Sequence, residues 1–287
     1  MRLGRTLKIV LALALVMTLI AGCGGGQPAD QDDEQSQGSD KAAGDKMRVA
    51  MVFAVGGLGD KSFNDSAYEG LKRAEAELGV EFDYVEPRSI AELEGYQRNL
   101  AKTKKYDLIL MLAHYQADAL KKVSAEFPEQ KFVIQDTIVE APNVASYMFK
   151  DHEKTFLIGA LVGQLIKTDL PKLNGSNKVG VVGGMDVPVI RSFVSGYMAG
   201  VKYVNPEAEV LVSYVGDFGN PAKGKETALA MYDRGADVVY HAAGGTGLGV
   251  FEAAKDVDRY AVGVDIDQLA TMCSGSITVW SISTPTA

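Results

Sequence analysis

The chain has 287 residues, of which 47% are hydrophobic, and it carries a net charge of −8 with a pI near 5.0. The acidic balance argues against a nucleic acid as partner, because no basic run or basic–aromatic interleaving offers positive charge to phosphates. The three histidines have no metal-ligand spacing among themselves or with the two cysteines, so we expect no metal and no cofactor.

The first predicted element is a signal peptide over residues 1–22. Two arginines and a lysine precede an uncharged apolar run, residues 9–21, which is shorter than the roughly 18–20 residues of a membrane-spanning helix. Cys23 follows a small-residue cleavage site, as in bacterial lipoproteins, whose cysteine is acylated and anchors the protein in a lipid bilayer. We therefore expect a protein on the extracytoplasmic face of the cell membrane. An ordinary signal peptide or N-terminal anchor with a chance cysteine is the alternative.

Residues 23–46 are predicted to form a disordered tether, because positions 24–46 contain no aromatic residue and no Leu, Ile, Val or Met. From residue 47 onward, short apolar runs alternate with amphipathic stretches. The first series comprises strands near 48–53, 80–85, 106–112, 131–135 and 144–149, with helices near 64–78, 90–102 and 116–126. The second comprises helices near 153–168, 188–204, 222–233 and 247–256, with strands near 177–182, 208–214, 236–240 and 260–264.

This alternation predicts an α/β fold with doubly wound parallel sheets flanked by helices and joined by right-handed crossovers. The continuously apolar run at 108–112 is typical of a strand covered on both faces. The similar openings RVAMVF and KVGVVGG indicate two lobes rather than one large sheet. We place the N-terminal α/β lobe at residues 47–149 and the C-terminal lobe at 150–268.

Turns rich in glycine and aspartate follow the predicted strands. Ligands of doubly wound sheets bind outside the carboxyl ends of the strands, so these turns would line a cleft between the lobes. The alternative is that they serve only turn geometry and helix capping. Their acidic character favours a neutral polyhydroxylated or a cationic ligand over a phosphate. They lie at 56–65, 135–137, 183–186, 216–219, 243–247 and 263–267.

Motifs for catalysis or phosphate binding are weak or missing in the sequence. Ser62 occupies the third glycine position of a dinucleotide fingerprint, and Asp60 stands where a P-loop needs its closing glycine. The sequence contains no GxSxG elbow, HExxH pair or CxxC pair. We therefore expect a protein that is not an enzyme.

Several segments in order resemble a known family, the basic membrane lipoproteins. They are GGLGDKSFNDSAYEGL, GGMDVPVIRSFVSGYMAGVKYVNP, DFGNPAKGKETAL, HAAGGTGLGVFEAAK and VGVDIDQ, and the resemblance covers about residues 47–268. Members of this family are substrate-binding proteins of ABC importers, and the better understood ones bind purine nucleosides. The resemblance implies a two-lobed periplasmic-binding-protein fold of type 1 that closes on its ligand by hinge motion.

By position in these motifs, Phe63 and Phe193 resemble the two aromatic residues that sandwich the base. Stacking on such rings contributes ~1–3 kcal/mol per base. The alternative for Phe193 is a core residue of a helix. Asn64 resembles a residue whose amide can donate to and accept from a base edge or a sugar, with helix capping as its alternative.

Further ligand contacts are implied by the same resemblance. Asp265 corresponds to the carboxylate expected to accept hydrogen bonds from ribose hydroxyls. Asp136 occupies another family contact position. Gly219 and Gly245 match glycines that let the backbone approach the ligand without an intervening Cβ.

Two departures from the family pattern stand out. Many members carry an acidic residue in a D-x-G-G pattern at the first loop, where this chain has Ala54, so we expect a different affinity or base preference. The resemblance ends after Gln268, and residues 269–287 form a divergent tail without a charged residue. We expect a truncated or frameshifted gene product whose tail does not pack as in the family.

These observations favour a membrane-anchored, monomeric binding protein. It would capture a nucleoside, which we expect to be a purine nucleoside, between two lobes and deliver it to an ABC transporter permease. The first alternative is a binding protein or sensor for a sugar or another small metabolite. The second, from a different class, is an extracytoplasmic nucleoside hydrolase.

Overall fold

The computed structural model describes residues 46–268. The predicted signal peptide, the acylated Cys23, the tether up to residue 45 and the divergent tail lie outside the described residues. Among the described helices, none combines the length and the apolar character that crossing a bilayer requires.

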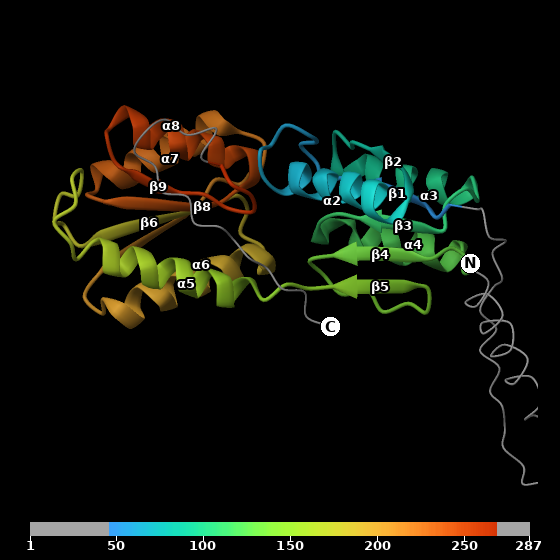
Figure 1. The fold of residues 1–287 in the computed structure, drawn as a ribbon, viewed down its shortest axis with the longest axis horizontal. Coiled ribbons are helices and arrows are strands. Elements are labelled where there is room, and N and C mark those ends of the chain that lie inside the picture. The colour runs from blue at the N-terminus through green and yellow to red at the C-terminus, as the bar shows by residue number, and fades with distance from the viewer. Residues whose placement is uncertain (1–45, 269–287) are drawn as a thin grey trace, which may run out of the picture. The chain divides into compact units, whose positions relative to one another are not determined.

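The first sheet has five parallel strands in the order β2-β1-β3-β4-β5 (Figure 1). Its strands are β1 (Arg48–Val52), β2 (Glu81–Val85), β3 (Leu108–Met111), β4 (Phe132–Gln135) and β5 (Val144–Tyr147). Alternate residues of β1 enter two different cores, because successive side chains of a strand point to opposite faces. The helices around this sheet are α2 (Phe63–Leu78), α3 (Leu93–Lys102) and α4 (Ala117–Glu126), with short 3₁₀ turns η1 (Ile90–Glu92) and η2 (His114–Gln116).

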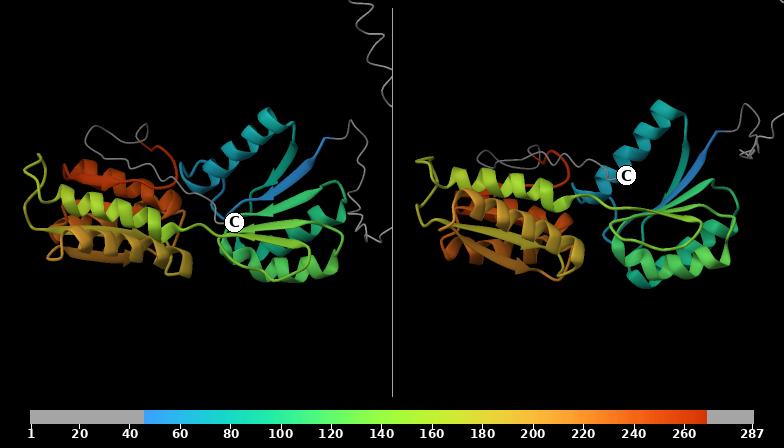
Figure 2. Two further views of the ribbon diagram at one scale, coloured as in Figure 1. Left: turned by 60° about the horizontal axis from the view of Figure 1, so that its bottom comes forward. Right: turned by 90° about the horizontal axis from the view of Figure 1, so that it is seen from below.

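Helices cover both faces of the first sheet. Helix α2 packs on one face through Leu71, and α3 and α4 pack on the other through Leu93 and Leu120 (Figure 2). Each helix therefore buries an apolar side against the β-branched and aliphatic residues of the strands, as a doubly wound fold requires.

The second sheet has four parallel strands in the order β7-β6-β8-β9. Figure 1 shows α5 and α6 on one of its faces and α7 and α8 on the other. Its strands are β6 (Lys178–Gly183), β7 (Glu209–Tyr214), β8 (Val238–Ala242) and β9 (Tyr260–Val262). Its helices are α5 (Asp151–Leu165), α6 (Pro188–Val204), α7 (Pro221–Asp233) and α8 (Leu248–Asp256), with the 3₁₀ turn η3 (Gly244–Gly247).

Helices α5 and α6 pack with their backbones in close contact because small residues face each other. A Cβ atom added at Gly200 would lie 1.9 Å from the carbonyl oxygen of Phe156, and one added at Gly159 would lie 2.0 Å from that of Tyr197. Glycine at these positions permits the close approach of α5 and α6.

The two parallel sheets flanked by helices confirm the predicted α/β, doubly wound fold class. Every predicted strand and helix of residues 47–264 has a counterpart; the helix predicted at 188–204 has the same bounds, and the others differ at one or both ends. The stretch predicted as one helix over 90–102 divides into η1 and α3, and the helix predicted at 153–168 begins at Asp151 and ends at Leu165. The lobe boundaries stay predictions; the strands of the two sheets fall within 48–147 and 178–262.

Candidate ligand-binding site

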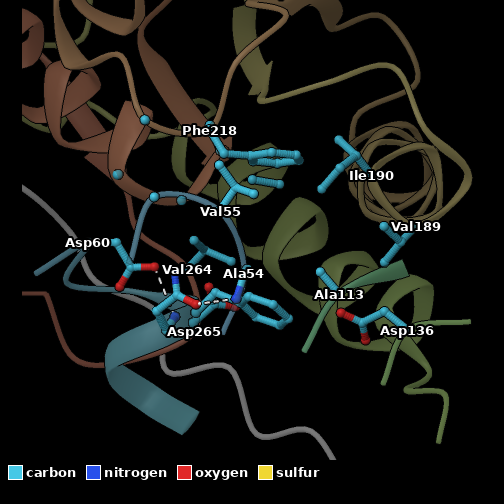
Figure 3. A pocket seen from close by; sticks show the side chains of 18 of the residues that line it. Ala54, Val55, Asp60, Ala113, Asp136, Val189, Ile190, Phe218, Val264 and Asp265 are labelled. Carbon is cyan, nitrogen blue, oxygen red and sulfur yellow. Dashed lines mark hydrogen bonds between the residues drawn. The ribbon is translucent and has the colours of Figure 1, made fainter. Parts of the chain in front are cut away.

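A cavity of about 260 Å³ lies at the carboxyl ends of strands from both sheets (Figure 3). In each sheet the strand order reverses beside a central strand, β1 in the first and β6 in the second. Loops that leave the sheet at such a point diverge and open a crevice. All of the predicted ligand-binding residues line this one cavity, namely Phe63, Asn64, Asp136, Phe193, Gly219, Gly245 and Asp265. Their roles in binding stay predictions.

Two aromatic side chains line the cavity from helices that pack on different sheets. Phe63 is the first residue of α2 and is partly buried. Phe193 belongs to α6, is 7% exposed and packs in the hydrophobic core of the second sheet. Phe193 is thus a core residue, as the alternative held, and it also lines the cavity.

Phe218 also brings an aromatic ring to the cavity and was not among the predicted site residues. A Cβ atom at Gly184 would lie 2.3 Å from the Phe218 ring, so the ring packs directly on the backbone that follows β6. The backbone N–H of Thr246 donates to the Phe218 carbonyl oxygen at 2.9 Å. Its place in the glycine- and aspartate-rich segment 216–219, after a predicted strand, is the sequence signal that could have identified it.

Asn64 is almost fully buried and stabilises the first loop. Its side-chain oxygen accepts a hydrogen bond from the backbone N–H of Ala54 at 3.0 Å. The alternative role of helix capping falls instead to Asp60, whose carboxylate accepts from the N–H groups of Ser62, Asn64 and Asp65 at 2.9–3.2 Å. Burial nevertheless raises the pKa of Asp60, against the effect of these three donors.

Asp136 and Asp265 follow β4 and β9 and bring two carboxylates to the cavity. Both have left-handed backbone angles, with φ of 67° and 66°. Burial, reinforced by the negative charges of Asp151 and Asp265, raises the pKa of Asp136 to about 7. Burial also raises the pKa of Asp265, whose Oδ2 accepts a hydrogen bond from the Ser62 hydroxyl at 2.5 Å. Aspartate tolerates this backbone region better than most residues, and strained angles often mark functional sites.

The two predicted glycines differ in their surroundings. A Cβ atom on Gly245 would lie 3.4 Å from the Phe218 carbonyl oxygen, so side-chain space there is limited. At Gly219 a Cβ atom would meet only Asp217 Oδ1, at 3.8 Å. Thr246 connects the loop of Gly245 to the loop of Gly219. Its hydroxyl donates to the Asp217 carbonyl at 2.9 Å and accepts from the Asn220 N–H at 2.8 Å.

The cavity walls combine acidic and apolar side chains. Figure 3 shows the carboxylates of Asp60, Asp136 and Asp265 around the cavity, with Ile190 on the wall provided by α6. Within residues 46–268, no group of three or more His, Cys, Asp or Glu side chains is placed to hold a metal ion. The arrangement can stack a flat ring and accept hydrogen bonds from hydroxyl or N–H groups.

Comparison with known proteins places the chain among transport proteins. The family model for PnrA-like ABC transporter substrate-binding proteins matches residues 47–282. This match extends past Gln268, so the end of the resemblance was placed too early. The nucleoside-binding protein BmpA of a Lactococcus lactis ABC transporter is 35% identical over 273 residues, which are 90% of this chain and 73% of that protein.

The chain is also similar to three further proteins. The CD4+ T-cell-stimulating antigen of Listeria innocua is 40% identical over 91% of this chain and 74% of its own length. An uncharacterized lipoprotein of Pyrococcus horikoshii is 36% identical over 87% of this chain, which spans 61% of that protein. The crystal structure of an ABC transporter solute-binding protein from Aeropyrum pernix has a TM-score of 0.73 at 35% identity, covering 77% of this chain and 63% of that one. The chain therefore belongs to the PnrA-like family of ABC transporter substrate-binding proteins.

Proposed function

We propose that this substrate-binding protein captures a purine nucleoside in the 260 Å³ cavity and delivers it to an ABC permease. The observation that carries the proposal is the presence of Phe63 and Phe193 in one cavity with Asp136 and Asp265. Two rings can stack on the faces of a base, for ~1–3 kcal/mol per base. These half-buried carboxylates can accept hydrogen bonds from ribose hydroxyls, for about 1.5–3 kcal/mol when charge-assisted.

The charge of the cavity supports a nucleoside over a nucleotide. Asp60, Asp136 and Asp265 contribute carboxylates to its walls. A phosphate placed among them would meet like charge in a partly desolvated site. A neutral ligand with several hydroxyl and N–H donors satisfies the same acceptors. The relatives of this family are binding proteins, and we infer that capture and release, without a reaction, is the function of this chain as well.

The test is calorimetric titration with inosine, guanosine, adenosine and ribose, together with chromatography for released base. We expect heat of binding with at least one purine nucleoside and no free base. Binding of ribose alone would favour a sugar-binding protein, and release of base would favour a nucleoside hydrolase.

We further propose that the protein is anchored on the extracytoplasmic face of the membrane through acylated Cys23. The charged start, the short apolar run and the cysteine support this proposal, as do relatives named as lipoproteins. One acyl chain binds a bilayer only marginally, so two or three chains are expected on Cys23. The Cys23→Ser variant should lose palmitate labelling and leave the membrane fraction. Equal membrane retention of variant and wild type would argue against the anchor.

A further inference from the structure

A second cavity of about 190 Å³ adjoins the ligand cavity and shares four of its residues, Phe63, Asp136, Phe193 and Asp265. Its remaining walls come from α2, from the ends of β3 and β4, and from the start of α5. Helix α5 brings Asp151 and Lys154 to this second cavity. The charges on α5 therefore adjoin the residues that we expect to contact the ligand.

Lys154 and Asp151 form a buried ion pair. The Lys154 ammonium lies 2.9 Å from Asp151 Oδ1, and the two side chains are only 12% and 6% exposed. The neighbouring pair Lys150–Glu153 has the same sequence spacing but side chains that are 50% and 59% exposed. Removing two charges from water costs free energy that their attraction rarely recovers, so a buried pair is weak evidence for stability. Its position beside the ligand cavity points to a different role.

The Lys154 ammonium also lies 4.5 Å from the centroid of the Phe193 ring. This distance permits a cation–π interaction, which is stronger where water is excluded. Phe193 is one of the two rings expected to stack on the base. Asp151 thus holds the Lys154 ammonium in place against the Phe193 ring of the ligand cavity.

Asp136 lines the second cavity together with this pair, whose two charges act on it and on Asp265. After burial, the charges of Asp151 and Asp265 are the main causes that raise its pKa to about 7. The Lys154 ammonium and the side chain of Gln135 act in the opposite direction. Because the pKa lies near neutrality, a modest change in the surrounding charge changes the protonation state of Asp136.

Other titratable groups face the same cavity from the remaining elements. Asp60 lies on the loop before α2, and His114 and Tyr115 lie on η2. Burial lowers the pKa of His114 and raises that of Tyr115 to about 12, so both side chains are neutral at pH 7. The pKa of Asp60 is raised by burial, and its carboxylate is bound by three backbone N–H groups. The charges on α5 and on Asp265 are therefore the principal ones around Asp136.

We propose that Lys154 and Asp151 are positioning residues for ligand capture, which orient the Phe193 ring and set whether Asp136 meets the ligand as an ionised acceptor or as a protonated donor. The proposal rests on the proposed function, because the nucleoside's hydroxyl groups would donate to ionised Asp136. Ligand affinity then falls as the pH drops below the midpoint of Asp136, by up to tenfold per pH unit.

The two charges of the pair predict shifts of opposite sign. Lys154→Met removes a positive charge, so the Asp136 midpoint moves to higher pH and nucleoside binding at pH 7 weakens. Asp151→Asn removes a negative charge, so the midpoint moves to lower pH and binding at pH 6 strengthens. A purely structural role of the pair would weaken binding in both variants and would not separate the midpoints.

The experiment follows the Asp136 carboxyl by ¹³C NMR between pH 4 and pH 9 in ligand-free protein, with Asp136→Asn to assign the signal. Inosine dissociation constants are measured over the same pH range. Lys150→Met and Glu153→Gln remove the charges of the exposed neighbouring pair and serve as matched controls. Lys154→Arg keeps the charge and should keep the midpoint and the affinity.

Opposite shifts of the Asp136 midpoint in Lys154→Met and Asp151→Asn, with unchanged midpoints in both controls, are the expected result. Shifts in the same direction, or shifts as large in the controls, overturn the inference. If no nucleoside binds but the midpoints separate, the charge-setting role stands and the proposed ligand is wrong. If Lys154→Met does not fold, Asp151→Asn decides the outcome. A lower Asp136 midpoint in Asp151→Asn, with unchanged midpoints in Glu153→Gln and Lys154→Arg, supports the inference. An unchanged or higher midpoint in Asp151→Asn overturns it.

Discussion

The hydroxyl of Ser62 donates a hydrogen bond to Asp265 Oδ2 at 2.5 Å and thereby joins the loop before α2 to the segment after β9. Gln268 adds a second link between the same segments. Its Nε2 donates to the Lys61 carbonyl at 2.9 Å, and its Oε1 accepts from the Val264 N–H at 2.8 Å. Asp265, which we expect to contact the ligand, therefore also connects a loop of the first sheet to a loop of the second.

Ser62→Ala should lower the free energy of unfolding by about 1.5–3 kcal/mol, because Ser62 is fully buried and its loss leaves the half-buried Asp265 carboxylate without this donor. Urea unfolding of the ligand-free protein measures the change. The control is Ser195→Ala, since the Ser195 hydroxyl is exposed and donates to Arg191 within the same helix. Equal losses in the two variants would contradict a special role for the contact between Ser62 and Asp265.

Removal of the Phe63 ring should weaken nucleoside binding. Phe63→Ala loses a stacking contact of ~1–3 kcal/mol, which corresponds to a dissociation constant roughly 5- to 150-fold higher. Phe193→Leu should act in the same direction, and leucine limits the cavity that alanine would leave in the core. Phe127→Leu, on the far side of the first sheet's core, is the control and should keep the affinity. Titration calorimetry with inosine tests the three variants, and unchanged binding by Phe63→Ala would exclude stacking on this ring.

Ala54→Asp should increase the preference for guanosine over adenosine by about tenfold. Ala54 is 5% exposed and lines the cavity, at the position where the family pattern has an acidic residue. A carboxylate there accepts hydrogen bonds from N–H groups at the guanine edge, and one charge-assisted bond amounts to about 1.4 kcal/mol or more. Competition binding measures the ratio, with Ala54→Asn as the size-matched control. An equal change of both affinities would show that position 54 does not read the base.

The parallel sheets could be predicted because apolar runs and helical periodicity alternate along the chain. The ends of the elements could not, since short 3₁₀ turns such as Ile90–Glu92 carry no periodic signal. The clustering of Phe63, Asp136 and Asp265 in one cavity was predictable as well. The carboxyl ends of parallel strands share an edge, so the loops that follow them meet.

Other features of the site depend on tertiary packing that the sequence pattern does not encode. Lys154 appears in the sequence as one of two lysines near the start of a helix, and only the fold buries it against Asp151 and Phe193. Phe218 is placed by its contact with Gly184, a residue of a different strand–helix connection. The acidic character of the cavity follows from the aspartates of its loops, whereas the position of this buried cation depends on tertiary packing.

His241 should make the protein less stable in mild acid. It is fully buried, and burial lowers its pKa to about 4. The unfolded chain, with a histidine pKa of about 6.5, binds more protons between pH 6.5 and pH 4. Stability is thus lost as the pH falls through this window, by ~3 kcal/mol in total from this group. The advantage of wild type over His241→Gln in urea unfolding should shrink from pH 7 to pH 4. The exposed His152→Gln is the control, and a constant advantage would contradict the shift.

Asp136 should act on stability in the opposite direction. Its pKa of about 7 in the fold exceeds the value of about 3.9 in an unfolded chain, so the native state binds more protons between these values. Stability from this group is therefore fully present below pH 4 and is lost as the pH rises towards 7. Asp136→Asn, which cannot ionise, should be more stable than wild type at pH 8 and similar to it at pH 4. Urea unfolding at the two pH values tests this, with Asp118→Asn on the exposed start of α4 as the control. A variant less stable than wild type at pH 8 would mean that the Asp136 carboxylate is better solvated than its burial implies.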